Sequence, residues 1–200
     1  HQVCTDSLKA IEGASRRYGT QVADRQLASV PVSSPEGGTY LSAMGSAANF
    51  AWANRQCIAH WARQCFEEVF GLSWEALGIR QVYDLSHNMA KVETHDVAGR
   101  EKRLCVHRKG ATRSFPPGHR AIPERYRGVG QPVLIPGDMG RYSFLAAGVA
   151  TAMDASFGST CHGAGRAESR THAKKMLRGR DIGQELEARG IVAMARGWAS

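Results

Sequence analysis

The sequence lacks the features that mark secreted and membrane proteins. It contains no apolar run that approaches the roughly 18 residues of a membrane span, and its N-terminus lacks the basic and then apolar stretches of a signal peptide. Its five cysteines are odd in number, and no two of them form a C-x-x-C pair. This usage argues against a disulfide framework and against a thiolate zinc site. We therefore expect a protein of the reducing cytoplasm without a membrane partner.

The composition is that of an ordinary globular chain. The 200 residues are 42% hydrophobic and 22% charged, which is enough for one sizeable core, so we expect one domain over residues 1–200. The formal charge of +8 favours a polyanionic partner, because clustered Lys and Arg displace counterions from phosphates. The sequence starts at His1 without a methionine, and we expect a truncated segment of a longer protein.

Hydrophobic periodicity predicts one dominant helix. Between Thr39 and Phe70 apolar residues mostly recur three or four positions apart in Ala-rich sequence without proline, as in a long core helix. Ser34 is placed as an N-cap before Pro35, and Gly71 supplies the C-terminal stop. Weaker helix patterns cover residues 2–17, 163–177 and 181–189.

Short apolar runs bounded by glycine-rich or polar turns predict strands. They cover residues 81–85, 103–107, 132–135 and 142–148. One long helix, several short strands and then further helices indicate a mixed α+β or layered α/β domain, because a regular βαβ alternation is not visible.

The stretch 157–166 is the most informative one for chemistry. Small residues surround His162, which leaves room for a bulky group, and the helix expected from Gly163 would offer its N-terminal dipole to a phosphate. A neutral imidazole can act as a nucleophile and form a phosphoramidate. Cys161 is expected to be a buried, inert thiol, because adjacent side chains diverge and a Cys/His dyad would need another histidine.

Three further stretches carry candidate ligand groups. His87 and Asn88 are expected where a strand ends, as metal ligands and phosphate-contacting amides often are, and a structural hydrogen-bonding role is the alternative. The basic run 106–113 either clamps phosphate or forms a solvated turn. The loop 135–140 either exposes its backbone groups to a nucleotide or is a plain tight turn.

A basic ridge is expected near the end of the sequence. Arg166, Arg170, Lys174 and Arg178 recur every fourth residue, which places them on one face of a helix. Such a ridge either follows a phosphate backbone or is a solvated charged face.

In this order, five sequence words resemble the RtcB family of RNA ligases. They are A-A-N-F-A-W-A-N-R-Q, Y-D-L-S-H-N-M-A-K-V-E, H-R-K-G-A-T-R-S-F-P-P-G, Q-P-V-L-I-P-G-D-M-G and F-G-S-T-C-H-G-A-G-R. The resemblance implies a mixed-sheet layered α/β domain of that family's type. It also implies a GTP- and manganese-dependent ligase that joins RNA ends bearing a 2′,3′-cyclic phosphate or 3′-phosphate to a 5′-hydroxyl, as in tRNA splicing and RNA repair.

The resemblance also implies roles for individual residues. It makes His162 the nucleophile that takes GMP from GTP, His87 a manganese ligand and Asn88 a nucleotide contact. The implied guanosine-binding loop and nucleotide cradle comprise Pro136, Gly137, Asp138, Met139, Ser143, Gly163, Ala164 and Gly165. Asp138 departs from the serine that is frequent in this family. The implied partners are RNA ends and, where turnover needs one, a protein activator of the archease type.

The resemblance further implies groups that this sequence does not contain. The family's Asp and Cys ligands, its Asn-His motif and a further histidine ligand fall upstream of His1, and its nucleotide-contacting lysine falls beyond Ser200. We therefore expect this chain alone to be inactive. Two alternatives remain, namely a noncatalytic basic RNA-binding segment and a histidine-dependent metallohydrolase that needs no GTP.

Overall fold

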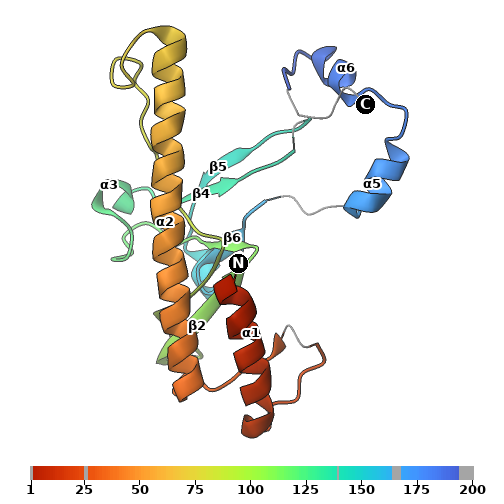
Figure 1. Cartoon of the computed structure of the whole chain (residues 1–200). Coiled ribbons are helices and arrows are strands. Elements are labelled where there is room, and N and C mark those ends of the chain that lie inside the picture. The colour runs from red at the N-terminus through yellow and green to blue at the C-terminus, as the bar shows by residue number, and fades with distance from the viewer. Residues whose placement is uncertain (1, 25–26, 139, 164–167, 194–200) are drawn as a thin grey trace. The chain divides into compact units, whose positions relative to one another are not determined.

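The computed structural model describes residues 2–24, 27–138, 140–163 and 168–193 (Figure 1). The chain divides into two compact units. The first comprises residues 1–84 and 89–107, and the second comprises residues 85–88 and 108–200. The single catalytic domain expected from the sequence stays a prediction.

The first unit is dominated by the long helix that the sequence predicts. It contains α1 (Gln2–Ser15), the short helix η1 (Arg16–Tyr18), α2 (Pro35–Phe70) and most of the strands β1 (Asn88–Asp96) and β2 (Glu101–Lys109). The helix predicted over residues 2–17 is confirmed as α1 and η1.

Local capping fixes both ends of α2. The Ser34 hydroxyl oxygen accepts a hydrogen bond from the Gly37 N–H at 3.0 Å, and Pro35 occupies the first turn. Gly71, at a φ of 64°, ends the helix by donating its N–H to a carbonyl one turn earlier. The predicted cap and stop are confirmed. The helix begins at Pro35 instead of Thr39 because the cap satisfies the first N–H groups.

α2 is long, but most of its large apolar residues are not buried. The exposed fraction is 76% for Phe50, 58% for Trp61 and 76% for Val69. α1 packs against α2 and buries Ile11 and Ala14. Large apolar residues on a helix are buried only where another element covers their face, and α1 is the element that packs against α2 in this unit. The expectation of a core helix is therefore wrong for these residues.

β1 and β2 pair in a two-stranded sheet. The strand predicted over residues 103–107 is confirmed within β2. The strand predicted over residues 81–85 is wrong, since they belong to no helix or strand. A side chain holds this segment instead, because Arg55 of α2 donates from Nε to the Asp84 carboxylate at 2.6 Å. His87 therefore precedes β1 and does not follow a strand.

The second unit is built from short elements. They are β3 (Ala111–Arg113), α3 (Glu124–Arg127), β4 (Pro132–Ile135), β5 (Phe144–Ala147), α4 (Thr151–Ser156), β6 (Ser159–Cys161), α5 (Arg170–Met176) and α6 (Ile182–Glu187). Two antiparallel ladders organise them, β4 with β5 and β3 with β6. The strands predicted over 132–135 and 142–148 are confirmed as β4 and β5. Phe115, Ile122 and Val133 are buried apolar residues of this unit.

Side-chain caps determine where the last two helices begin. Ser169 caps α5 and Asp181 caps α6, each by accepting a hydrogen bond from an N–H group in the first turn. α5 therefore begins at Arg170 and not at Gly163, so its N-terminus does not directly follow the candidate nucleophile. Residues 164–167 lie outside the described ranges.

The combination of helices and short strands confirms the α+β class. Within the described residues the strands form three separate two-stranded sheets, and the layered mixed sheet implied by the resemblance stays a prediction. None of the helices in the described ranges has both the length and the apolar composition that crossing a membrane requires.

Candidate active site

His162 follows a strand that places it next to the turn between β2 and β3. β3 and β6 pair antiparallel with Ala111 opposite Cys161, so the residues just outside this ladder, Gly110 and His162, lie side by side. The His162 Nδ1 lies 2.8 Å from the Gly110 carbonyl oxygen. The ladder and this hydrogen bond together fix the position of the imidazole ring.

The Gly110 carbonyl decides which nitrogen of His162 is available for chemistry. A carbonyl oxygen only accepts, so Nδ1 carries the proton of the hydrogen bond. In the neutral ring Nε2 then holds the lone pair. An imidazole in this tautomer presents Nε2 as a nucleophile or as a metal ligand.

The same turn brings His87 to His162. Gly110 adopts a φ of 69°, a left-handed conformation that favours glycine. Its N–H donates to the His87 carbonyl oxygen at 2.9 Å and to the Asn88 side-chain oxygen at 3.2 Å. The His87 and His162 rings stack with centroids 4.4 Å apart and planes inclined by 20°. The two histidines assigned to one site therefore lie in contact, and their roles stay predictions.

Pro136, the first residue after β4, lies against the backbone beside His162. A Cβ added to Gly163 would lie only 3.0 Å from the Pro136 carbonyl oxygen, so glycine allows the two backbones to approach closely. The second unit thus brings together the candidate nucleophile, the other histidine and the start of the candidate guanosine loop.

Contacts within the loop determine its shape. A Cβ added to Gly137 would lie 2.0 Å from the Tyr142 carbonyl oxygen, which no side chain tolerates. The Gly137 N–H donates to the Ser143 hydroxyl oxygen at 3.2 Å. Pro136, Gly137, Asp138 and Ser143 are exposed, so this surface of the loop is open to a ligand.

Asp138 and Arg189 brace the far end of the loop. The Asp138 carboxylate accepts the Gly140 N–H at 2.8 Å and lies 3.7 Å from the Arg141 guanidinium. Arg189, which follows α6, donates to the Gly140 carbonyl oxygen at 2.8 Å. Asp138 thus contacts its own loop, and its contact to a nucleotide stays a prediction. Outside the described residues lie Met139, Ala164 and Gly165.

The arginines of the basic run 106–113 form neither a phosphate clamp nor a solvated turn. Arg108 is 3% exposed and donates to the Ser159 hydroxyl and to the Phe157 carbonyl oxygen, each at 2.8 Å. Arg113 donates from Nε to a side-chain amide oxygen just before β4 at 3.1 Å. Both expectations are wrong for these residues, because their guanidinium groups satisfy acceptors inside the second unit.

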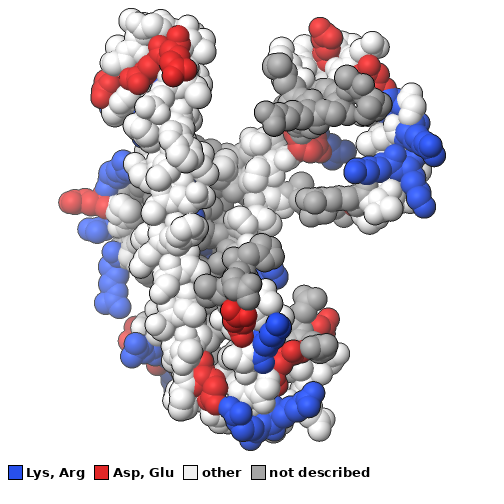
Figure 2. All heavy atoms as spheres, viewed as in Figure 1, with Lys and Arg blue, Asp and Glu red and all other residues white. Residues whose placement is uncertain are grey.

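The predicted basic ridge does not form on one helix. α5 ends at Met176, so Arg178 lies in the turn beyond it, and Arg166 lies outside the described residues. Figure 2 shows Lys and Arg side chains gathered over α5 and the turn that follows, where Lys174, Lys175 and Arg178 are exposed. This local positive charge suits a polyanionic partner.

The cysteine beside the candidate nucleophile is accessible. Cys161 is exposed at the end of β6, so the expectation of a buried thiol is wrong. β6 is too short to bury its last residue, whose side chain lies at the rim of the ladder. Among the four cysteines whose burial is described, Cys105 on β2 is partly buried, and burial raises the pKa of its thiol.

The described residues do not build a metal site by themselves. Among them, no group of three or more His, Cys, Asp or Glu side chains lies close enough together to hold an ion. His87 offers one imidazole, whereas manganese prefers several ligands that are rich in oxygen. A manganese site does not fit these residues alone, and we assign no chemical step to the metal.

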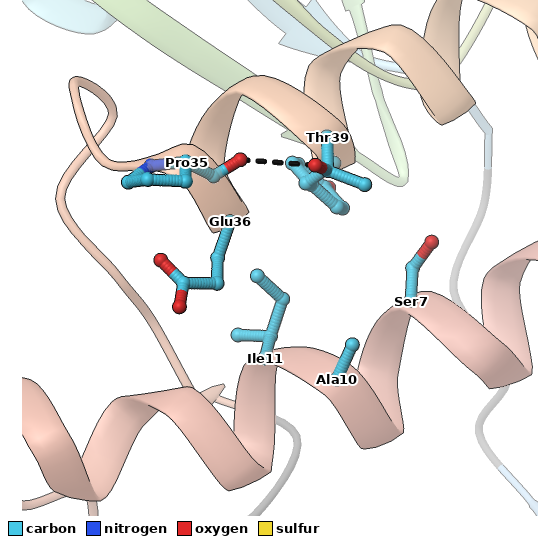
Figure 3. A pocket seen from close by; sticks show the side chains of 7 residues that line it. Ser7, Ala10, Ile11, Pro35, Glu36 and Thr39 are labelled. Carbon is cyan, nitrogen blue, oxygen red and sulfur yellow. Dashed lines mark hydrogen bonds between the residues drawn. The ribbon is translucent and has the colours of Figure 1, made fainter.

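A separate hollow in the first unit lies between α1 and α2 (Figure 3). Its volume is about 190 Å³, and its lining comprises Ser7, Ala10, Ile11, Pro35, Glu36, Thr39 and Tyr40. Glu36 pairs with Arg17 and accepts the Tyr18 hydroxyl proton at 2.8 Å. Thr39 donates to the Pro35 carbonyl oxygen at 3.0 Å. The Glu36 contacts join η1 to α2, and the Thr39 bond lies within α2. We assign the hollow no chemistry.

Sequence reasoning missed the contacts that orient the site. Gly110 binds His162 across 52 residues of sequence, and Arg108 and Arg189 each bind a carbonyl oxygen 49 residues away. Local patterns do not reveal such distant partners. The available signal was a glycine directly after a strand, at Gly110, because this position often requires a positive φ.

Comparisons with known proteins match nearly the whole chain. The family model for the tRNA-splicing ligase RtcB matches residues 1–200. A tRNA-splicing ligase RtcB of Archaeoglobus fulgidus is 53% identical over 195 residues, which are 98% of this chain and 40% of that protein. Those of Pyrococcus abyssi and Thermococcus kodakarensis are 57% and 53% identical, and the match covers 98% of this chain and 21% and 40% of theirs. The chain thus spans less than half the length of these relatives.

Proposed function

The chain belongs to the RtcB family of tRNA-splicing ligases, and from this premise we propose that it forms part of a GTP-dependent RNA ligase. The proposed reaction joins an RNA end bearing a 2′,3′-cyclic phosphate or a 3′-phosphate to a 5′-hydroxyl end, as in tRNA halves or broken RNA. One observation carries the proposal: the His162 Nδ1 is bound to the Gly110 carbonyl oxygen, which leaves Nε2 available for attack.

His162 is the nucleophile of this proposal. Its Nε2 lone pair attacks the α-phosphorus of GTP, pyrophosphate leaves, and a phosphoramidate bond joins Nε2 to GMP. A 2′,3′-cyclic phosphate is first opened by water, which leaves a 2′-hydroxyl and a 3′-phosphate. The guanylate then passes to the RNA 3′-phosphate, and the 5′-hydroxyl displaces GMP as the new phosphodiester forms. Nδ1 keeps its proton during the first step, so the Gly110 carbonyl stabilises the positive charge that develops on the ring.

The neighbouring loop and amide are the proposed nucleotide contacts. The exposed positions Pro136, Gly137, Asp138 and Ser143 are proposed to bind guanosine, because the loop begins at Pro136, which lies against the backbone of Gly163 next to the nucleophile. Asn88 uses its side-chain oxygen to brace Gly110, so its NH₂ group is the proposed donor to a phosphate. Met139, Gly163, Ala164 and Gly165 belong to this proposal through the family resemblance.

Manganese is the proposed metal, with His87 as one ligand. When bound, it would neutralise phosphate charge. The described residues contain no group of three or more ligating side chains, so the remaining ligands are proposed to come from outside them. The proposed partners are RNA ends and, for turnover, a protein activator of the archease type.

A noncatalytic RNA-binding segment is the second candidate function. The exposed basic residues on and after α5 favour this candidate, because Lys and Arg side chains bind phosphates by charge and need no nucleophile. This candidate predicts RNA binding that weakens with salt and forms no GMP adduct. A histidine-dependent metallohydrolase would instead release phosphate without GTP.

A chimera separates these candidates. The 195 matching residues of the Archaeoglobus fulgidus protein are replaced by this chain, and the unaltered relative serves as the positive control. We expect the chimera to seal a cyclic-phosphate end to a 5′-hydroxyl end only with GTP and manganese. RNA binding without sealing would favour the binding segment, and phosphate release without GTP would favour the hydrolase.

The His162→Ala chimera is the matched variant. It should not ligate a cyclic-phosphate end, because no other group forms the phosphoramidate. It should still ligate an RNA end that already carries the guanylate, because that step comes after His162 has acted. Loss of both reactions would indicate a folding defect and would require the milder His162→Gln change.

A further inference from the structure

Arg108 is a buried arginine to which the proposed reaction gives no role. It is 3% exposed. Its Nε donates to the Ser159 hydroxyl and its Nη2 donates to the Phe157 carbonyl oxygen, each at 2.8 Å. Its guanidinium carbon also lies 5.9 Å from the centre of the Phe115 ring. Burying a guanidinium is costly unless its donors are satisfied, so these contacts indicate a specific structural task.

The turn that Arg108 holds has an unfavourable backbone conformation. Phe157 adopts a φ of 51°, which a residue with a bulky side chain rarely does. Gly158 follows at a φ of 62°, and a Cβ there would lie 2.4 Å from the Phe115 ring. A turn of this kind persists only when its surroundings hold it. Arg108 binds the residues on both sides of Gly158.

This turn leads directly into the strand that precedes His162. β6 starts at Ser159 and has three residues, so a displacement of the turn reaches the imidazole through one short ladder. Gly110, whose carbonyl binds Nδ1, follows Arg108 closely in the chain. The same short stretch therefore contacts both ends of the segment that ends in His162.

We propose that Arg108 is a positioning residue: through Ser159 and Phe157 it holds the His162 imidazole on the Gly110 carbonyl and so keeps Nε2 free. The effect of Arg108 on catalysis rests on the proposed function, whereas its effect on the orientation of the His162 ring does not. Lysine does not replace Arg108, because one ammonium lacks the planar fork that donates in two fixed directions.

Nitrogen-15 NMR of the histidine side chains tests the effect on the ring. The protein has eight histidines, and the His162→Gln variant identifies the signals of His162. We expect the Nδ1-protonated form in the wild-type chain and a mixture of both tautomers in Arg108→Gln. Arg108→Lys should fall between them. Arg103→Gln, at an exposed position of β2, is the matched control and should leave the signals unchanged.

A milder variant keeps the test decisive if Arg108→Gln does not fold. Ser159→Ala removes the hydroxyl that accepts from Arg108 Nε and should shift the tautomer ratio part of the way. A folded Arg108→Gln or Ser159→Ala chain with wild-type His162 signals would overturn the proposal.

Kinetic measurements on the chimera test whether Arg108 affects catalysis. Arg108→Lys should lower the rate of GMP transfer to His162 on the order of a hundredfold, with little change in KM for GTP, because misplacement affects attack more than binding. An active chimera that is indifferent to Arg108→Lys would overturn the positioning role. Altered NMR signals together with a chimera that forms no adduct, even with Arg108 intact, would refute the proposed function and leave the positioning inference standing.

Discussion

The orientation of His162 depends on a backbone carbonyl, that of Gly110. A carbonyl oxygen only accepts, so Nδ1 holds the proton of this hydrogen bond, and the lone pair of the neutral ring is at Nε2. This hydrogen bond thus distinguishes the two ring nitrogens: Nδ1 binds the carbonyl, and Nε2 is available for chemistry.

The cysteines provide a test of accessibility beside the site. Burial raises the pKa of Cys105 above its ordinary value, and Cys57, Cys65 and Cys161 are exposed. Because only the thiolate reacts, iodoacetamide at neutral pH should label Cys105 after these three cysteines, and its labelling should become faster as the pH rises. Mass spectrometry of peptides over time measures the order. Labelling of Cys105 before Cys161 would contradict the described burial.

At the scale of single residues, the sequence identified the candidate site residues, but it did not identify the contacts that hold them in place. His87, His162 and the loop from Pro136 lie within the sequence words that carry the family resemblance, and the structure brings them together. The roles of Arg108 and Gly110 depend on partners about fifty residues away. Tertiary pairing decides such contacts, and neither periodicity nor local composition contains them.

At the scale of elements, the predictable ones are those with local causes. α2 was predictable because its apolar spacing, the Ser34 cap and the Gly71 stop all lie within the helix or next to it. The strands β3 and β6 were not predictable, since each has only three residues and forms by pairing with the other. The strand expected over residues 81–85 failed for the related reason that an extended run needs a ladder as well as apolar residues.

The cap of α2 gives a stability prediction. Ser34→Ala should lower the free energy of unfolding by about 1 kcal/mol, because the Gly37 N–H loses its acceptor. Ser34→Thr should retain most of the stability, since its hydroxyl also accepts from Gly37 and donates to the Pro31 carbonyl oxygen. Ser46→Ala is the matched control, because the Ser46 hydroxyl only donates to a carbonyl within α2. Urea unfolding followed by circular dichroism measures all three. Equal losses at Ser34 and Ser46 would refute the capping account.

The contact between η1 and α2 gives a pH prediction. Hydrogen bonds from its own backbone N–H, from Tyr18 and from Arg17 lower the pKa of Glu36 below its ordinary value of 4.5. A lowered pKa in the folded state stabilises the protein above the unfolded value, and this contribution is lost as the pH falls through the folded value. Glu36→Gln should therefore destabilise the chain at neutral pH and converge with the wild type in acid.

Urea midpoints measured between neutral pH and acid check this. Glu75→Gln, at an exposed residue beyond α2, is the control. A difference between Glu36→Gln and the wild type that stays constant with pH would show that the carboxylate charge is not involved.

At the scale of the whole molecule, the exposed apolar residues of α2 and the small number of metal ligands are the main features that the fold leaves unexplained. The chain spans 40% of the Archaeoglobus fulgidus relative. The described residues contain no group of three or more ligating side chains, and attack on a triphosphate needs metal charge near the α-phosphate. The proposed manganese therefore needs ligands from outside the described residues.

The isolated chain should not guanylylate itself with saturating manganese and GTP. His87 alone should bind manganese weakly, so the metal would rarely be in place when GTP arrives. Incubation with α-labelled GTP followed by denaturing electrophoresis measures the adduct. A robust GMP band on the isolated chain would show that other residues of this chain replace the expected ligands.

Mapping of the covalent guanylate in the chimera tests the central claim most directly. The chimera is incubated with GTP and manganese, digested under alkaline conditions that preserve phosphoramidates, and analysed by mass spectrometry beside its His162→Gln variant. The account predicts GMP on the peptide that contains His162 and no adduct in the variant. GMP on another residue, or an undiminished adduct in His162→Gln, would contradict it.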